Sequence, residues 1–120
     1  MARKYINSNI ELNKDLEKPM VLEEFGLGRD KISYDPKSTV GIRDDYFRNV
    51  FQYIYDRALT DQMISGVNFW AYGGQGRPKE NGGWWAAGDD FIGDPPHERQ
   101  GWYSIYDIDH TTLRMVSGFT

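Results

Sequence analysis

Two short apolar segments, with a long amphipathic segment between them, limit most strongly what this chain can fold into. Residues 20–22 and 66–72 are short, apolar and flanked by charged residues, glycine or proline, which predicts two buried strands. Residues 39–61 repeat large apolar side chains in steps of three and four, which predicts a helix with one apolar face. Strand, helix and strand in this order predict an α/β fold in which two parallel strands are joined by a crossover helix.

Further helices are expected near both ends of the chain, over residues 5–17 and from Thr111 or Thr112 to residue 120. Pro19 ends the first of them. Thr39 is expected to be the N-cap of the central helix. The side chains expected to face the core are Ile6, Ile10, Leu12 and Leu16 of the first helix, and Phe47, Val50, Phe51, Ile54, Tyr55 and Leu59 of the central helix.

Glycine, proline and aspartate recur over residues 26–41 and again after residue 72, which predicts two loops. The second loop, of about thirty residues, is long for a compact domain, and such loops commonly carry a binding or active site. A short extended piece is expected over residues 104–108. Two strands cannot bury both faces of a parallel sheet. The sequence therefore predicts that residues 1–120 form a single partial domain of a larger fold.

The composition excludes several functions and leaves one choice open. A net charge of −4 gives no basic surface for nucleic acid, and the lack of cysteine excludes disulfides and thiolate metal sites. No apolar run reaches the roughly 20 residues of a membrane span. Aromatic residues make up 15% of the chain and glycine occurs 13 times. Aromatic rings on glycine-rich loops suit sugar binding because a pyranose face is apolar, but the same rings could simply cover a small core.

A pair of glutamates, Glu23 and Glu24, follows the first predicted strand. Side chains alternate across a strand, so the two carboxylates are expected to point to opposite sides. At the carboxyl end of a barrel strand, where barrel enzymes hold their active sites, a carboxylate is a candidate nucleophile or base. The alternative is a salt bridge at the strand end or a carboxylate that caps a loop.

The residues around this pair resemble those of a known family. The stretch KPMVLEEFG resembles the seventh-strand motif of glycoside hydrolase family 5, in which the glutamate before an aromatic residue and a glycine is the nucleophile; here that residue is Glu24. The stretch GVNFWAY resembles the eighth strand, whose tryptophan, here Trp70, floors the subsite of the sugar under attack. The chain also resembles the C-terminal segment of β-mannanases, one branch of this family, in WAYGGQGR, GDDFIGDPP and GDPPHERQGWYSIYDIDHTTL. The resemblance implies the C-terminal part of a (β/α)8 barrel, about its last two βα units plus the preceding helix.

The resemblance also implies that the parent protein is a retaining endo-β-1,4-mannanase in which Glu24 forms a glycosyl-enzyme. A second carboxyl group, about 5 Å from the nucleophile, would protonate the leaving oxygen. In the family this acid follows an asparagine, and no Asn-Glu pair occurs in the sequence. Glu23 is not the missing acid, because its side chain is expected to leave the opposite face of the strand and to support the helix layer. The isolated chain is therefore expected to be inactive.

The candidate substrate-binding residues are Trp70, Trp84, Trp85 and Arg77. One of the two adjacent tryptophans is expected to line a subsite while the other packs inward, and the sequence leaves open which one. For Arg77, contact with sugar hydroxyls and a salt bridge within the loop remain alternatives. Neither histidine lies at metal-ligand spacing from the other or from a carboxylate cluster. No metal and no cofactor are predicted.

The expected ligand is a β-mannan polysaccharide or a manno-oligosaccharide, with another β-glucan left open. A non-catalytic carbohydrate-binding fragment and a scaffold piece are the alternative functions. Open strand edges recruit other strands, so the chain is expected to self-associate or to receive the missing barrel units from another chain. The first residues, MARKYINSN, lack the apolar core of a signal peptide. The parent is nevertheless expected to be secreted or periplasmic, because its polymer substrate cannot enter the cell.

Overall fold

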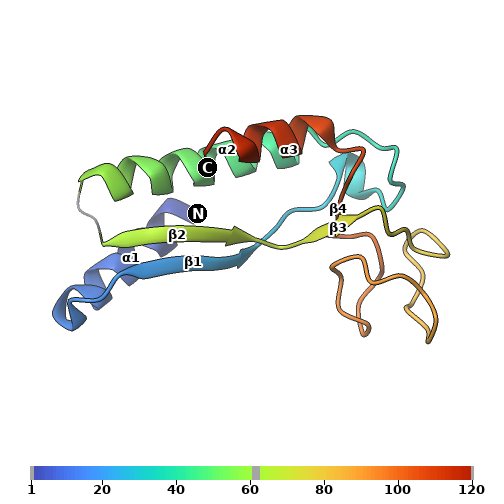
Figure 1. Cartoon of the computed structure of the whole chain (residues 1–120), viewed down its shortest axis with the longest axis horizontal. Coiled ribbons are helices and arrows are strands. Elements are labelled where there is room, and N and C mark those ends of the chain that lie inside the picture. The colour runs from blue at the N-terminus through green and yellow to red at the C-terminus, as the bar shows by residue number, and fades with distance from the viewer. Residues whose placement is uncertain (1, 61–62, 120) are drawn as a thin grey trace.

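The computed structural model describes residues 2–60 and 63–119, which form helices on one side of two short parallel strand pairs (Figure 1). The elements in chain order are α1 (Ala2–Asn13), a 3-10 turn (Lys14–Leu16), β1 (Met20–Phe25), a second 3-10 turn (Asp30–Ile32), α2 (Gly41–Thr60), β2 (Ile64–Phe69), β3 (Tyr72–Gly74), β4 (Ile105–Tyr106) and α3 (His110–Ser117). The helices α2 and α3 lie side by side, and α1 packs against β1 and α2.

The predicted crossover unit is confirmed, because β1 and β2 pair in parallel and α2 connects them. Met20 lies opposite Ile64, and Phe25 lies opposite Phe69. Both strands differ from the predicted ranges: β1 continues through the two glutamates, and β2 starts earlier and ends before residue 70. The chain then forms β3, which pairs in parallel with β4 where a short extended piece was predicted. The end of the predicted central helix at residue 61 lies outside the described residues.

The core lies between the strand pair and the helices. Phe25 of β1 contacts Phe47 and Phe51 of α2, with ring centroids 5.0 and 5.7 Å apart. Ile6 and Ile10 of α1 complete this cluster. The prediction of the apolar stripes was wrong at their ends, since Leu12, Leu16, Tyr55 and Leu59 are exposed. A two-stranded sheet is too narrow to cover the full length of either stripe.

The cap of α2 is Asp30, and the prediction that Thr39 caps this helix was wrong. The Asp30 carboxylate accepts hydrogen bonds from the N–H groups of Gly41 and Ile42, both at 2.9 Å. These are first-turn donors that have no partner within the helix. The Thr39 hydroxyl donates to the same carboxylate at 2.6 Å instead of capping the helix itself. Aspartate supplies two acceptor oxygens, which a threonine hydroxyl cannot do.

This cap predicts a pH-dependent contribution to stability. Hydrogen bonds from the Thr39 hydroxyl and from the Ile42 N–H hold the pKa of Asp30 below its usual value of 3.8. A carboxyl group with a lowered folded-state pKa stabilises the fold above pH 3.8, and this contribution is lost as pH falls through the lower folded value. Asp30→Ala is therefore expected to lower stability in urea denaturation at pH 7, and the gap to the wild type should shrink in strong acid. The exposed Asp45→Ala is the control; an Asp30→Ala gap that stays constant with pH would contradict the assignment.

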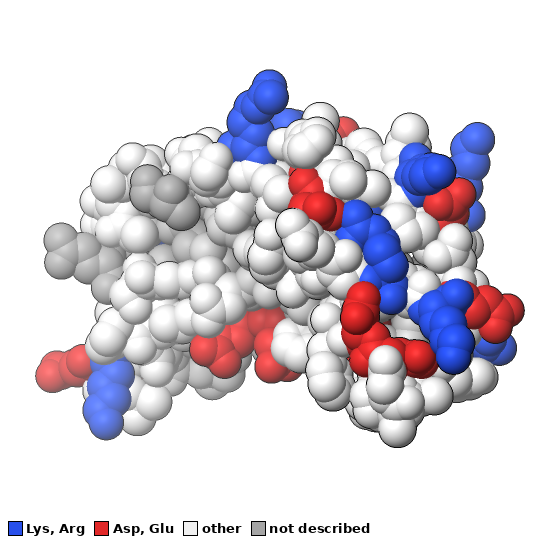
Figure 2. All heavy atoms as spheres, turned by 45° about the vertical axis from the view of Figure 1, so that its right-hand side comes forward, with Lys and Arg blue, Asp and Glu red and all other residues white. Residues whose placement is uncertain are grey.

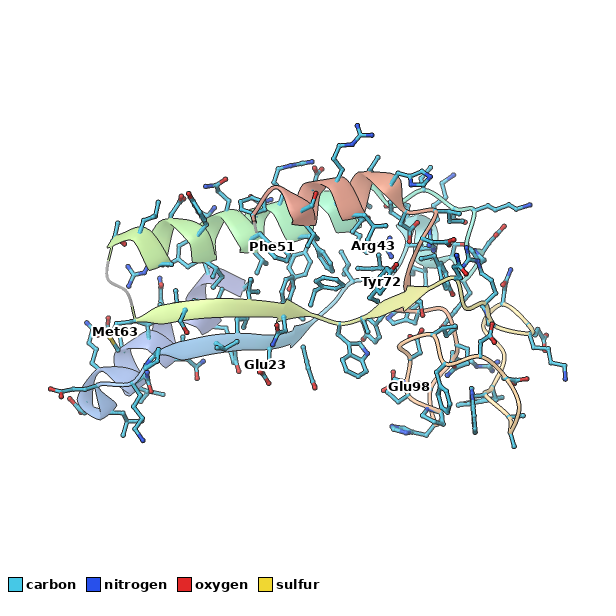
Figure 3. The ribbon with its side chains drawn as sticks, in the orientation of Figure 1. Glu23, Arg43, Phe51, Met63, Tyr72 and Glu98 are labelled. Atoms are coloured by element: carbon cyan, nitrogen blue, oxygen red, sulfur yellow. The ribbon has the colours of Figure 1, made fainter. Side chains whose placement is uncertain are left out.

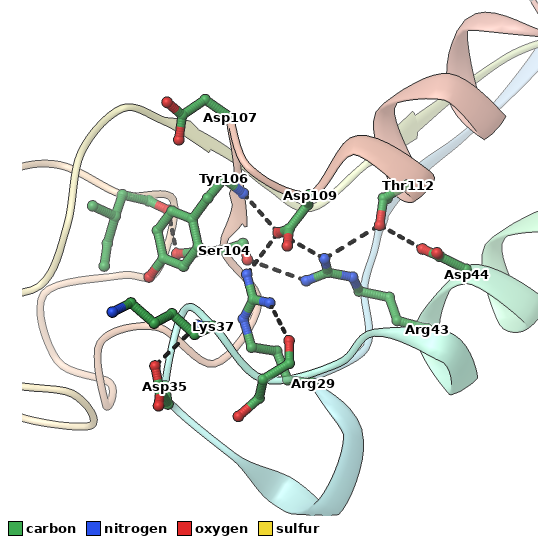
Figure 4. Close-up of polar contacts among 12 residues, drawn as sticks. Arg29, Asp35, Lys37, Arg43, Asp44, Ser104, Tyr106, Asp107, Asp109 and Thr112 are labelled. Atoms are coloured by element: carbon green, nitrogen blue, oxygen red, sulfur yellow. Dashed lines mark hydrogen bonds and ion pairs between the residues drawn. The ribbon is translucent and has the colours of Figure 1, made fainter.

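A buried polar cluster ties the loop after β1 to the start of α3 (Figure 4). Its centre is Asp109, whose Oδ2 accepts from Arg29 at 2.6 Å, from Arg43 at 2.8 Å and from the Tyr106 N–H at 2.9 Å. Burial lowers the pKa of Arg43, and the nearby Asp109 opposes that shift. Thr112, which was predicted as a possible cap of α3, is buried here and contacts Arg43. This cluster fixes the two loops that border the candidate site.

On the face that carries the long loop, basic and acidic side chains are interspersed (Figure 2). Within residues 2–60 and 63–119, no helix has both the length and the hydropathy to cross a membrane.

Candidate functional site

A hollow of about 560 Å³ lies where β1 and β2 end. Its lining includes Glu24, Gly26, Tyr46, Trp70, Glu98 and Tyr103. Glu24 belongs to β1, and Gly26 follows this strand. Trp70 follows β2, and Glu98 and Tyr103 come from the long loop. The structure therefore brings together two of the predicted site residues, Glu24 and Trp70, at the carboxyl ends of parallel strands.

Close backbone packing holds Trp70 beside the end of β1. The Trp70 N–H donates to the carbonyl oxygen of Phe25 at 2.8 Å, one residue beyond Glu24. A Cβ atom at Gly26 would lie 2.5 Å from the Trp70 carbonyl oxygen and 2.9 Å from the Tyr103 ring. Only glycine lets these two strand ends approach so closely. The peptide bond between Trp70 and Ala71 is cis.

The two glutamates do not alternate as predicted. Glu24 has a left-handed backbone with φ 55°, and the strand register shifts between Leu22 and Phe25. Glu23 is exposed and points away from α2 and α3 (Figure 3), and its carboxylate contacts β2 and not a helix, so the prediction that it supports the helix layer was wrong. Its carboxylate accepts a hydrogen bond from the Asn68 side chain at 3.3 Å, across the open face of the strand pair. Leu22 and Phe25 take the helix-facing positions instead.

The Glu24 carboxylate is available for chemistry. Glu24 is exposed, and among residues 2–60 and 63–119 its side chain has no hydrogen-bond or ion-pair partner. Tyr46 lines the same hollow, and burial raises the pKa of its phenol. The Tyr46 hydroxyl therefore stays protonated at neutral pH and can donate a hydrogen bond.

Glu98 is a site residue that the sequence analysis missed. It is half-buried, lines the hollow with Glu24, and lies on the same side of the ribbon as Glu23 (Figure 3). Its segment, GDPPHE, contributed to the family resemblance, but nothing in the pattern singled out this carboxylate. Glu98 reaches the hollow because of the way in which the long loop folds.

The loop that carries Glu98 is fixed by its own buried polar side chains. Asp94 accepts hydrogen bonds from the backbone N–H groups of Gly101 at 3.0 Å and Tyr103 at 2.8 Å. The Gln100 amide donates to the carbonyl oxygens of Pro95 at 2.9 Å and Glu98 at 3.1 Å. A loop without regular structure is thus held in one conformation beside the hollow.

Arg77, Trp84 and Trp85 do not line the hollow. The Arg77 guanidinium pairs with Asp107 and donates to two backbone carbonyls, so it anchors the long loop to β4. This ion pair reaches Asp107, which lies after β4, so it differs from the salt bridge within the loop that was one alternative for Arg77; contact of Arg77 with sugar hydroxyls stays a prediction. Among the described residues, no group of three or more histidine, cysteine or acidic side chains is placed to hold a metal ion.

An exposed carboxylate and an aromatic side chain at the carboxyl ends of parallel strands define a site of the kind found in (β/α)8-barrel enzymes. A family profile described as GH family 5 beta-mannosidase-like matches residues 1–120. The chain is 30% identical over 116 residues to mannan endo-1,4-beta-mannosidase 5 of Arabidopsis thaliana, covering 96% of this chain and 24% of that protein. It is 35% identical over 75 residues to mannan endo-1,4-beta-mannosidase 4 of Solanum lycopersicum, covering 62% of this chain and 18% of that protein. The chain thus belongs to the β-mannosidase-like members of glycoside hydrolase family 5.

Solved structures agree with this assignment. The family 5 mannosidase from Rhizomucor miehei superimposes with a TM-score of 0.84 at 35% identity, over 97% of this chain and 29% of that protein. The endo-beta-1,4-mannanase from Thermotoga petrophila, at 22% identity and a TM-score of 0.58, shares the fold. The resemblance that the sequence motifs predicted is confirmed. The chain spans about a quarter of the length of the relatives it matches.

Proposed function

We propose that this chain supplies part of the active site of a retaining β-mannoside hydrolase, with Glu24 as the nucleophile and Trp70 as the floor of the sugar subsite. The observation that carries the proposal is that these two side chains share one hollow at the carboxyl ends of β1 and β2. A mutant of the Rhizomucor miehei mannosidase has been solved in complex with mannosyl-fructose, which supports a mannoside ligand.

In the proposed reaction, the Glu24 carboxylate attacks the anomeric carbon, and the bond from that carbon to the leaving oxygen breaks. A carboxylic acid about 5 Å away gives the leaving oxygen its proton. It then removes a proton from a water, whose oxygen bonds to the anomeric carbon as the bond from that carbon to Glu24 breaks. The tyrosine hydroxyl of Tyr46 and the carboxylate of Glu98 line the same hollow and suit hydrogen bonds with sugar hydroxyls. The family's acid follows an asparagine, and this sequence has no such pair. We assign the acid to a part of the barrel outside residues 1–120.

The strand pair also supports a place for the chain within a barrel. Among the described residues, β1 and β2 pair with each other and each keeps one edge without a partner strand. Unpaired strand edges recruit further strands. We propose that the chain forms the last two βα units of a (β/α)8 barrel, with the preceding helix α1, and that further units, or a second copy of the chain, occupy these edges. The substrate would be a β-mannan or a manno-oligosaccharide. The parent protein would act on it outside the cytoplasm.

Reducing-end release from a soluble β-mannan tests this division of roles. The isolated chain is expected to release no more reducing ends than its Glu24→Gln variant, because the acid is missing. Release by the wild-type chain that Glu24→Gln abolishes would contradict the proposal, since it would place an acid within residues 1–120. Glu98→Gln removes the other carboxyl group that lines the hollow. If the wild-type chain did release reducing ends, this variant would show whether Glu98 supplies the acid.

A further inference from the structure

Trp84 and Arg99 lie on two loop segments that run next to each other, and one of these segments carries Glu98, which lines the hollow. They form an antiparallel bridge, and on one side of it the Gly82 N–H donates to Gln100 O at 3.0 Å and the Gln100 N–H donates to Gly83 O at 2.9 Å. Residues paired in this way have Cα atoms about 5 Å apart. Since Arg99 directly follows Glu98, the Cα atom of Trp84 lies within about 10 Å of the Cα atom of Glu98, whose residue lines the hollow.

The two adjacent tryptophans have different surroundings. Trp85 is half-buried, stacks on Phe91 with ring centroids 5.2 Å apart, and donates its indole N–H to the carbonyl oxygen of Asp89 at 3.3 Å. Its ring is used in holding the loop together. Trp84 is 60% exposed, so most of its indole is accessible to a ligand.

Arg99 gives the exposed indole a fixed polar neighbour. The Arg99 guanidinium lies 4.9 Å from the centre of the Trp84 ring. One of its nitrogens donates to the Gly82 carbonyl oxygen at 2.8 Å, which orients the group. A guanidinium has five N–H donors, so others remain for a ligand. The guanidinium lies over one face of the ring, and the accessible part of the indole together with the oriented donors matches a pyranose, which has an apolar face and hydroxyl groups at its edge.

We propose that Trp84 and Arg99 form an outer subsite that binds a distal unit of the same β-linked sugar chain whose reacting unit lies on Trp70. This inference rests on the proposed function, because it needs a sugar in the hollow. A chain leaving the hollow past Glu98 meets Arg99 and Trp84 next. In this proposal the subsite lies beyond the second sugar unit of the bound chain, so it gives the protein a preference for longer oligosaccharides over mannobiose.

Calorimetric titration of the chain with β-1,4-mannobiose and β-1,4-mannohexaose tests the subsite. Trp84→Ala is expected to weaken binding of the hexaose about fivefold, the loss expected for one aromatic contact, and to leave the biose unchanged. Trp84→Phe keeps a flat ring and should retain most of the affinity. Tyr72→Ala removes an equally exposed aromatic side chain from β3, outside the proposed subsite, and should have no effect. Circular dichroism spectra check that each variant is folded.

The outcomes separate this inference from the proposed function. Hexaose binding that is the same in the wild type and in Trp84→Ala would overturn the outer subsite alone. Binding of neither sugar by the wild type would overturn the proposed binding of mannosides by this chain, and the outer subsite with it. Trp70→Ala should weaken both sugars alike, because it acts on the unit in the hollow.

Discussion

Asp109→Ala is expected to destabilise the fold by about 3–5 kcal/mol, the cost of leaving a buried charge without its partner. Arg29 is 3% exposed and Arg43 is fully buried, and both guanidinium groups donate to the same oxygen of Asp109. The substitution leaves two cations inside the protein without their shared anion. A loss of this size is a large part of the roughly 5–15 kcal/mol that holds a typical domain together. Urea denaturation followed by circular dichroism measures it.

The exposed pair between Asp45 and Arg48 provides the matched control. Its charged atoms lie 2.9 Å apart, but both side chains are more than half exposed. Asp45→Ala is expected to change stability by less than about 1 kcal/mol, as is usual for surface pairs. Asp109→Asn keeps an acceptor oxygen without the charge and should fall between the two. Equal losses in Asp109→Ala and Asp45→Ala would show that the buried cluster does not hold the loops together.

Gly26→Ala is expected to cost about 1–3 kcal/mol and to disturb the site, because the new methyl group has no room. It would lie 2.5 Å from the carbonyl oxygen of Trp70 and 2.9 Å from the ring of Tyr103. A backbone oxygen cannot swing aside as the end of a flexible side chain can. The ends of β1 and β2 must therefore separate, which moves Trp70 away from Glu24. Thermal denaturation measures the cost, and the near-ultraviolet circular dichroism of the tryptophans reports the shift.

Gly41→Ala separates this clash from the general effect of adding a methyl group. Gly41 begins α2, and a Cβ atom there would lie 3.6 Å from its nearest neighbour, an ordinary contact. This variant is expected to be as stable as the wild type or slightly more stable, because alanine favours helix over glycine. If Gly26→Ala matched Gly41→Ala in stability and spectrum, the close approach of the two strand ends would not be required.

The parts of the fold that were predictable from the sequence depend on local patterns. The apolar repeat of α2 and the two short apolar segments were enough to predict a parallel βαβ unit. Glu24 and Trp70 were predicted from the family resemblance of two motifs that include these strands. The orientation of Glu23 was predicted wrongly, because the left-handed backbone at Glu24 interrupts the alternation on which the prediction depended.

Other parts of the site were not predictable because they depend on contacts between distant positions. Asp109 binds Arg43, 66 residues away, and Arg29, 80 residues away. No spacing rule links such partners. Glu98 reaches the hollow only because Asp94 and Gln100 fix a loop that has almost no regular structure.

Covalent labelling is the most direct test of whether Glu24 is the nucleophile. A 2-deoxy-2-fluoro-β-mannosyl fluoride loses fluoride without needing a proton, so the first step needs no acid. We expect a Glu24 oxygen to bond to the anomeric carbon as fluoride leaves. Mass spectrometry should then find one sugar on the peptide that contains Glu24 and none on the same peptide of Glu24→Gln. An unlabelled wild-type chain, or a label that persists in Glu24→Gln, would contradict the assignment of Glu24 as the nucleophile.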